Sequence, residues 1–410
     1  MTLPTPTSRL SFLPRLVLAC VMLGAPVLAT AQTVDTAAVP AASAVTTQTM
    51  SVGELSPVPI PALGAKAWLT LDANSGQVIA SENRDEKVEP ASLTKIMAAY
   101  VVFEALETKR LTLDQKVRVS EHAWKTEGSR MFIDPNSEVS IDDLLQGLIV
   151  QSGNDATVAL AEAVSGSESA FVALMNQEAA RQGLTGTHFT NSSGLPDPEH
   201  YTTVHDLAIL SRNLVQRFPQ YLHYYSQREY TYNKIKQSNR NRLLWADQTV
   251  DGLKTGHTKS AGYCLVTTAL RDGRRVISVL VGAASDAART ESSLKLLNWS
   301  FRNFDTVRMI DQDQAAVHAK IWGGVEDAVA LGPQQALWVT VPRGREADIQ
   351  SVAHYTEPLM APVAKGDTVG TLEIQLEGKI LASMPLQVQQ DIAQAGFFGR
   401  AYDQIRLLFE

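Results

Sequence analysis

The sequence predicts a protein of the mixed α/β (α+β) class. An antiparallel sheet flanked by helices is expected first, followed by a small all-β domain and a terminal amphipathic helix. Three patterns carry this prediction: apolar residues at helical spacing over 96–106, paired apolar strands around the turn at 272–273, and short alternating strands after residue 306. A chain of 410 residues, 45% hydrophobic and 19% charged, is long enough for a large core and two domains.

The first domain, expected over residues 61–305, opens with a hairpin and a helix. Strands at 68–71 and 78–79 flank the turn Asn74-Ser75-Gly76. Pro90 precedes a run of apolar residues at helical spacing, so Ser92 is expected at or just inside a helix start.

Later elements of this domain follow from capping and turn signals. Ser140 and Asp143 form a capping box for a short helix through residue 150, and Asp155 is a candidate cap for the next helix. A long polar loop is expected over 191–200. A hairpin over 265–281 and a helix over 290–299 close the domain.

Two segments follow this domain. Short strands alternating with regular turns predict a β-rich domain over 306–388. Residues 389–410 are expected to form an amphipathic helix, which would either lie at a membrane interface or pack on its own protein. Interfacial helices are usually rich in Lys and Arg, whereas the charges of 391–410 sum to −1, so the residues alone leave both alternatives open.

The N-terminal segment has the pattern of a secretory signal over residues 1–31. Arg9 and Arg15 give a positively charged start, residues 16–28 form an apolar stretch, and Ala29-Thr30-Ala31 fits a cleavage site. Residues 32–60, rich in Ala, Thr, Val and Pro without a period, are expected to be a flexible leader. Cleavage would change the net charge from −7 to −9, and such an acidic chain offers no electrostatic basis for binding nucleic acid.

The composition also argues against metal, cofactor and disulfide chemistry. Cleavage would remove Cys20, which leaves Cys264 alone in an apolar run where a buried, unreactive thiol is expected. His200 and His205 are the only histidines near metal-ligand spacing, and polar roles in a loop and a helix suit them better. No Gly-rich phosphate loop is present, so no cofactor is expected.

Three short polar motifs indicate the chemistry: Ser92-Leu93-Thr94-Lys95, Ser152-Gly153-Asn154 and Lys254-Thr255-Gly256. Residues three apart share a helix face, so the Lys95 amine can reach the Ser92 hydroxyl. A serine hydroxyl needs a base, and a lysine acts as one when burial and a nearby cation keep it neutral. Lys254 is the expected cation. Together the motifs suit acyl transfer through a serine.

A Ser three residues before a Lys is not by itself informative. A second example, Ser292-Ser293-Leu294-Lys295, has no accompanying motifs and is expected on a solvated helix face. The set around Ser92 differs because Ser152 follows 60 residues later and Lys254 follows 102 residues after that.

The chain resembles the serine-type D-alanyl-D-alanine carboxypeptidases, the low-molecular-mass penicillin-binding proteins. The resemblance is close over about 55–305 and looser beyond, and it extends to segments around the motifs: 91–97, 147–156, 171–176, 239–245 and 251–258. It implies a DD-peptidase/β-lactamase-like catalytic domain and a β-rich second domain. It also implies a terminal helix that commonly holds the enzyme on the outer face of the inner membrane, in the periplasm.

The resemblance further implies roles for the motif residues. Ser92 attacks the carbonyl between two terminal D-alanines of a peptidoglycan pentapeptide stem, and Lys95 takes its proton. Ser152 relays a proton to the leaving amine. Asn154 holds the peptide backbone of the substrate and Lys95. The backbone N–H groups of Ser92 and His257 bind the oxyanion. The terminal carboxylate lies against a last group of residues: Lys254, Thr255, Gly256 and Arg289. Arg289 has a plainer alternative as a surface arginine at a helix start. β-Lactams would acylate Ser92 and stall there.

Two other functions use the same residues differently. A β-lactamase would need a glutamate and a positioned water for deacylation, and Glu199 is the glutamate in the expected loop. A non-catalytic envelope protein that binds muropeptide and organises cell shape would have no need of an intact nucleophile, base and relay.

Overall fold

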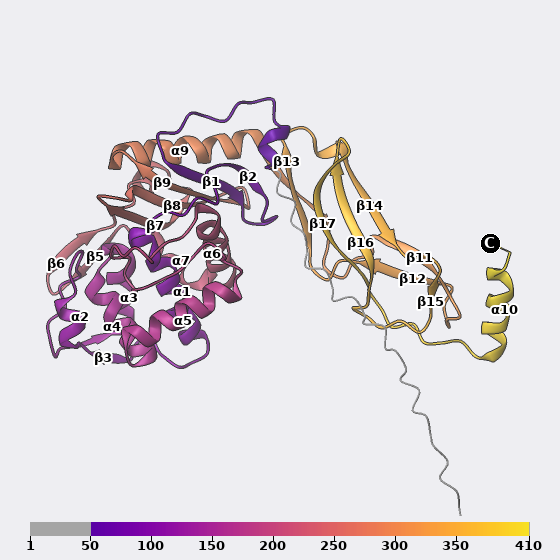
Figure 1. Ribbon diagram of the computed structural model, residues 1–410, viewed down its shortest axis with the longest axis horizontal. Coiled ribbons are helices and arrows are strands. Elements are labelled where there is room, and N and C mark those ends of the chain that lie inside the picture. The colour runs from indigo at the N-terminus through magenta and orange to yellow at the C-terminus, as the bar shows by residue number, and fades with distance from the viewer. Residues whose placement is uncertain (1–50, 410) are drawn as a thin grey trace, which may run out of the picture. The chain divides into compact units, whose positions relative to one another are not determined.

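A computed structural model describes residues 51–409 of the chain (Figure 1). The expected signal over 1–31 and most of the expected leader lie outside the described residues. The end of that leader is not loose: the 3₁₀ helix η1 (Val52–Leu55) buries Val52 in a cluster with Trp68, Ile79 and Trp299. The folded body therefore begins before residue 61, because an apolar side chain is buried there.

The helices and strands occur in a mixed order up to residue 303 and as strands after it. The helices are α1 (Lys95–Glu107), α2 (Glu121–Lys125), α3 (Ile141–Gln146), α4 (Asn154–Ser165), α5 (Glu168–Arg181), α6 (Val204–Arg217), α7 (Leu222–Ser226), α8 (Leu243–Ala246), α9 (Asp286–Asn303) and α10 (Phe397–Leu407). The strands are β1 (Ala67–Asp72), β2 (Val78–Glu82), β3 (Lys116–Arg118), β4 (Glu138–Ser140), β5 (Glu229–Tyr232), β6 (Ile235–Ser238), β7 (Val250–Thr258), β8 (Gly262–Arg271), β9 (Arg274–Ala283), β10 (Phe304–Ile310), β11 (Val317–Trp322), β12 (Ala328–Gly332), β13 (Leu337–Pro342), β14 (Ile349–Tyr355), β15 (Leu359–Met360), β16 (Thr368–Leu376) and β17 (Lys379–Val388).

The first domain is built on an antiparallel five-stranded sheet in the order β2-β1-β9-β8-β7. Side chains alternate across it: Leu69 and Leu71 join the helical core, whereas Trp68 packs with Leu296 and Trp299 of α9. Helix α9 covers one face, with the short helix α8 packed against it, and helices α1 to α7 gather on the opposite face (Figure 1). This is the predicted sheet flanked by helices, and β7 lies at its edge.

The expected helix at Ser92 forms, with a tighter first turn. Residues 91–94 make the 3₁₀ helix η2, which runs directly into α1. Helix α1 is buried nearly all round, which is typical of a helix at the centre of a domain. Ser92 therefore sits in a short turn fixed to a buried helix.

The prediction that Ser140 caps the next helix is confirmed. The Ser140 hydroxyl accepts the Asp143 N–H at 3.0 Å and donates to the Asp143 carboxylate at 2.6 Å. Helix α3 then continues as a π-helical turn, η3 (Gly147–Gln151), and stops at Ser152, whose φ of 65° is left-handed. Ser152 thus ends one helix just before α4 begins.

The prediction that Asp155 caps the next helix is wrong. Gly153 is the N-cap of α4, and Asp155 lies inside the helix with no exposed surface. Its carboxylate accepts the backbone N–H groups of Met131 at 2.9 Å and Phe132 at 3.0 Å. Asp155 therefore holds the preceding loop, 128–133, against α4.

Two other expectations need correction, and one element is new. Helix α9 spans 286–303, longer at both ends than the expected 290–299, and its earlier start follows from the cap that Ser285 provides. The serines of the second Ser-Ser-Leu-Lys segment are buried, with Ser293 1% exposed, because that side of α9 packs on the sheet; only Lys295 is solvated, paired with Glu291. The short hairpin β5–β6 was not anticipated.

After residue 303 the described chain is mainly β, as expected. A six-stranded sheet, β14-β16-β17-β12-β11-β15, accompanies the pair β10-β13, and helix α10 ends the described chain. Over 51–409, no single helix has both the length and the hydropathy to cross a membrane, and α4 with α5 meets the criteria only as a pair bent by 82°.

Candidate active site

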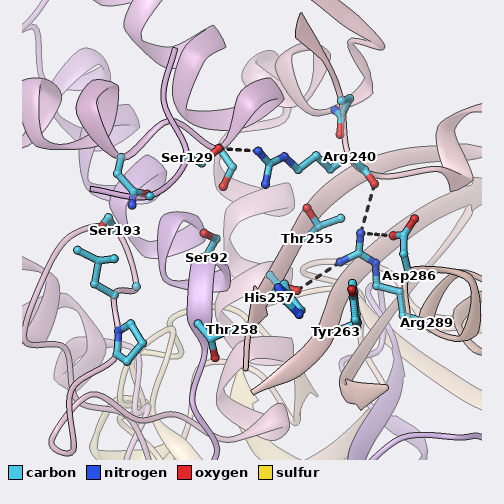
Figure 2. A pocket seen from close by; sticks show the side chains of 18 of the residues that line it. Ser92, Ser129, Ser193, Arg240, Thr255, His257, Thr258, Tyr263, Asp286 and Arg289 are labelled. Atoms are coloured by element: carbon cyan, nitrogen blue, oxygen red, sulfur yellow. Dashed lines mark hydrogen bonds and ion pairs between the residues drawn. The ribbon is translucent and has the colours of Figure 1, made fainter. Parts of the chain in front are cut away.

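Residues from all three motifs line one cavity of about 540 Å³ (Figure 2). Seven of the nine predicted site residues line it: Ser92, Ser152, Asn154, Thr255, Gly256, His257 and Arg289. The other two, Lys95 and Lys254, are buried and hydrogen-bond to Ser92 and Ser152. The sequence therefore located the same cavity from segments more than 50 residues apart.

The Lys95 amine has three polar neighbours whose chemistry fixes its orientation. Its Nζ lies 2.7 Å from Asn154 Oδ1, 2.6 Å from the Ser193 carbonyl oxygen and 3.2 Å from Ser92 Oγ. The first two oxygens only accept, and Asn154 is held in this orientation because its Nδ2 donates to the Glu127 carbonyl. A neutral amine has two N–H groups, so these two acceptors leave its lone pair for the Ser92 hydroxyl.

The charge state of Lys95 fits that orientation. Burial, with the nearby positive charge of Arg240, lowers the pKa of Lys95 to about 7, against a partly opposing effect of Asp155. Arg240 is thus a second cation near Lys95 that the motifs did not indicate, while Lys95 and Lys254, the expected cation, also repel each other, which lowers the pKa of Lys254. A substantial fraction of Lys95 is thus neutral near neutral pH.

Lys254 forms the second amine–hydroxyl pair. Its Nζ donates to Ser152 Oγ at 2.8 Å and to the Thr255 carbonyl at 3.1 Å. Burial, followed by the charges of Lys95, Arg240 and Arg289, lowers the pKa of Lys254 well below its usual value. Because Ser152 Oγ accepts from this amine, its own hydrogen is free to face the cavity.

Two glycines let the backbone segments approach one another. A Cβ on Gly256 would lie 3.3 Å from the Ala91 side chain, so β7 can pass close to η2. Gly194 has a left-handed φ of +86°, and a Cβ there would lie 1.8 Å from the Ala91 carbonyl oxygen. Both contacts bring neighbouring segments against the turn that carries Ser92.

Arg289 forms part of the cavity wall, and its alternative as a surface arginine is wrong. The residue is 5% exposed, and its guanidinium donates to the carbonyl oxygens of Gly256 and Cys264 at 3.3 Å. It also pairs with Asp286 at 2.5 Å, as Figure 2 shows. A helix-borne cation is thereby fixed at the end of the site where Thr255 lies.

Sequence reasoning missed Arg240, Ser129 and the Ser193 carbonyl. Arg240 donates to Ser129 Oγ at 2.6 Å across the cavity (Figure 2). Arg240 lies in the segment 239–245, which carries part of the family resemblance, and that resemblance was the available signal for a role of its charge in a buried site. Every residue has a backbone carbonyl, so the sequence gave no signal for the role of the Ser193 carbonyl.

Other residues behave as expected or are excluded from the site. Cys264 is buried, and burial raises the pKa of its thiol to about 11. Glu199 is exposed and does not line the cavity; among the described residues, Asp286 is the carboxylate that does, and it is paired with arginines. Within 51–409 no cluster of three His, Cys, Asp or Glu could hold a metal ion.

Comparison with known proteins gives the same relationship over nearly the whole described chain. Residues 54–285 match the D-alanyl-D-alanine carboxypeptidase family, and residues 304–394 match the C-terminal domain of penicillin-binding protein 5. The chain is 44% identical to D-alanyl-D-alanine carboxypeptidase DacC of Escherichia coli over 360 residues, which cover 86% of this chain and 90% of that protein.

Solved structures show the same similarity in three dimensions. Penicillin-binding protein 5 from Haemophilus influenzae superposes with a TM-score of 0.80 at 39% identity, over 82% of this chain and 100% of that one. Penicillin-binding protein D2 from Listeria monocytogenes in its ampicillin-bound form has a TM-score of 0.55 at 32% identity, over 60% of this chain and 100% of that one. The predicted fold class is confirmed, and the chain belongs to the D-alanyl-D-alanine carboxypeptidase family of serine peptidases, within the penicillin-binding proteins.

Proposed function

We propose that Ser92 is the nucleophile and Lys95 its general base in removal of the terminal D-alanine from peptidoglycan pentapeptide stems. The observation that carries this proposal is that Asn154 Oδ1 and the Ser193 carbonyl hold Lys95 Nζ 3.2 Å from Ser92 Oγ, so that the lone pair of the neutral amine faces this hydroxyl. Neutral Lys95 takes the hydroxyl proton as Oγ bonds to the carbonyl carbon between the two D-alanines. A tetrahedral oxyanion results.

The oxyanion is held by the backbone N–H groups of Ser92 and His257. Ser92 is the second residue of η2, and the first N–H groups of a helix have no partner within it. Donors fixed in place before the reaction stabilise developing charge without having to reorganise. His257 supplies the second donor from the strand that faces this turn.

Collapse of the intermediate requires a proton on the leaving nitrogen. Ser152 gives its hydroxyl hydrogen to that nitrogen and recovers one from Lys254, whose Nζ is 2.8 Å away. The C–N bond breaks, D-alanine leaves, and an ester remains on Ser92. Lys95 then passes its proton to solvent and Lys254 regains one from solvent, which restores both amines. Water attacks the ester with Lys95 again accepting the proton, and that proton passes to Ser92 Oγ as the ester C–O bond breaks and the shortened stem is released.

The terminal carboxylate of the substrate sets the position of the scissile bond. Thr255, Lys254 and Arg289 supply a hydroxyl and positive charge at one end of the cavity, and Gly256 keeps β7 close to Ser92. Asn154 holds Lys95 and the peptide backbone. A β-lactam carries a comparable carboxylate beside a reactive amide, so it acylates Ser92 and dissociates slowly.

Acylation should depend on pH with a midpoint near 7. The neutral form of Lys95 is the active one, so the second-order rate constant for acylation by penicillin should fall about tenfold per pH unit below the midpoint and level off above it. Since Arg240 lowers this pKa, Arg240→Gln should move the midpoint to higher pH. Stopped-flow acylation at a series of pH values measures both, and a flat profile would contradict the role of Lys95.

Mass spectrometry of a pentapeptide stem incubated with the protein tests the overall reaction. Loss of one alanine, with a penicillin adduct mapped to Ser92, is the expected result. Rapid hydrolysis of penicillin without a lasting adduct would favour a β-lactamase instead. Absence of both reactions from folded protein would favour a non-catalytic muropeptide-binding role.

We further propose a domain organisation and a location for the enzyme. A signal over 1–31 directs export, and a leader precedes the catalytic domain, which reaches residue 305. The β-rich domain, 306–388, and the helix within 389–410 follow, with the enzyme on the periplasmic face of the inner membrane. Large apolar side chains on α10 support the membrane contact, since Phe398 is 86% and Ile405 59% exposed.

Replacing two of these side chains should release the protein from membranes. Phe398→Ser with Ile405→Ser should weaken binding to vesicles of bacterial phospholipid by about 100-fold or more, because each large apolar side chain contributes about 1.5–3 kcal/mol when buried. Sedimentation with vesicles measures the change. Val325→Ser removes an exposed apolar residue outside the helix and should have no effect. Unchanged sedimentation of the double variant would contradict the anchor.

A further inference from the structure

A buried histidine outside the proposed catalytic set connects the loop 190–200 to the turn that carries Ser92. His200 is 2% exposed. Its Nε2 lies 2.8 Å from Thr94 Oγ1, and its Nδ1 lies 3.0 Å from the backbone nitrogen of Thr190. The proposed catalytic steps use neither His200 nor Thr94.

The partners of His200 fix the position of its ring hydrogen. A backbone N–H only donates, so Nδ1 accepts from Thr190 and the ring hydrogen is on Nε2. The Thr94 hydroxyl donates its own hydrogen to the Ala91 carbonyl at 2.8 Å, so it accepts from His200. Burial lowers the pKa of His200 to about 4, which keeps the ring neutral and this donor order intact near neutral pH.

The Ala91 carbonyl, which ends this series of hydrogen bonds, belongs to a residue with an unusual backbone conformation. Ala91 directly precedes Ser92 and has a φ of +47°, a region that residues with a side chain rarely adopt. Such a conformation persists only where the surrounding contacts hold it. Two contacts from the loop 190–200 do so here: the His200–Thr94 pair, and Gly194 against the Ala91 carbonyl.

The same loop also orients the base. The Ser193 carbonyl accepts from Lys95 Nζ at 2.6 Å, and Ser193 lies beside Ser92 in Figure 2. A shift of this loop relative to η2 would therefore disturb both the aim of Ser92 and the lone pair of Lys95.

We propose that His200 is a positioning residue, which locks the loop 190–200 to the turn before Ser92 through Thr94 and so holds the nucleophile and base in register. The imidazole does not line the cavity at Ser92. This inference rests on the proposed roles of Ser92 and Lys95 and adds a residue on which their alignment depends.

Matched substitutions in the full chain test the proposal. His200→Leu removes both hydrogen bonds, whereas His200→Gln keeps a donor and an acceptor on one side chain. Thr94→Val removes the hydroxyl and Thr94→Ser keeps it. The measurements are the rate constant for acylation by a fluorescent penicillin, kcat and KM for a D-Ala-D-Ala peptide, and thermal unfolding.

The expected pattern is specific to alignment. His200→Leu and Thr94→Val should each slow acylation by about 10- to 100-fold and lower kcat with little change in KM, and the double variant should lose no more than either alone. The Gln and Ser variants should stay within about threefold of the unmodified protein. His205→Leu, at a half-buried histidine paired with Asp85, is the control and should be unaffected.

Three results would overturn the proposal: normal acylation by folded His200→Leu, equal losses in the Leu and Gln variants, or losses that multiply in the double variant. If His200→Leu does not fold, the acylation rates of Thr94→Val and Thr94→Ser are compared instead, and equal rates would overturn the proposal. Mapping the adduct in the unmodified protein separates the two levels of inference, because an adduct absent from Ser92 would remove the proposed function itself.

Discussion

Ser92→Ala is expected to abolish labelling by penicillin and to lower kcat for a D-Ala-D-Ala peptide by at least about 10⁴-fold, as loss of a nucleophile does in other serine peptidases. The variant removes the oxygen that forms the acyl bond, and the other two hydrogen-bond partners of the Lys95 amine are an amide oxygen and a backbone carbonyl, not hydroxyls. The free energy of unfolding should change by no more than about 1 kcal/mol, because one hydrogen bond is lost. Gel fluorescence, steady-state kinetics and thermal unfolding measure these effects.

The chain contains its own control for this variant. Ser292 opens the second Ser-Ser-Leu-Lys segment but lies on α9, on the other side of the sheet from α1. Ser292→Ala should label like the unmodified protein. Full labelling of Ser92→Ala would mean that a different residue is acylated.

Lys95→Met is expected to give the second largest loss. A general base contributes about 10²- to 10⁴-fold, so acylation should slow by that factor while the protein stays folded. Methionine is close to lysine in length, and it removes an amine whose charged form is costly to bury. Combined with Ser92→Ala it should cost nothing further, since the two residues act in one step.

Lys295→Met is the matched control, because that lysine is exposed and paired with Glu291. Near-normal acylation of Lys95→Met would transfer the role of base to Lys254 acting through Ser152. The pKa of Lys254 should rise in Lys95→Met, since the Lys95 charge is one cause of its depression.

Local patterns were sufficient to predict the parts of the site that local structure creates. Ser92 and Lys95 are brought together by a single turn, and the helix start was signalled by Pro90 and the apolar spacing after it. The hairpin β8–β9 was likewise predicted from its turn residues, with Arg271 opposite Arg274. In these cases the partners are close in sequence.

Local patterns could not supply contacts between distant segments; the Asn154–Lys95 contact was expected only from the family resemblance. Asp155 looked like a helix cap because such residues favour caps, but its carboxylate binds backbone N–H groups more than 20 residues away. The positive charge of Arg240 near Lys95 was missed for a similar reason: the motif indicated Lys254, whereas only folding brings Arg240 to the site. Tertiary packing decided both.

The backbone conformation of Ala91 favours a high catalytic rate at the expense of the stability of the folded protein. Its φ of +47° costs an alanine about 1–2 kcal/mol, a cost that glycine does not bear. Selection for heat resistance alone would therefore tend to admit Ala91→Gly, which frees the hinge ahead of the reactive oxygen. Stabilised descendants of this enzyme would be expected to survive higher temperatures while turning over more slowly, as a stability–activity trade-off requires.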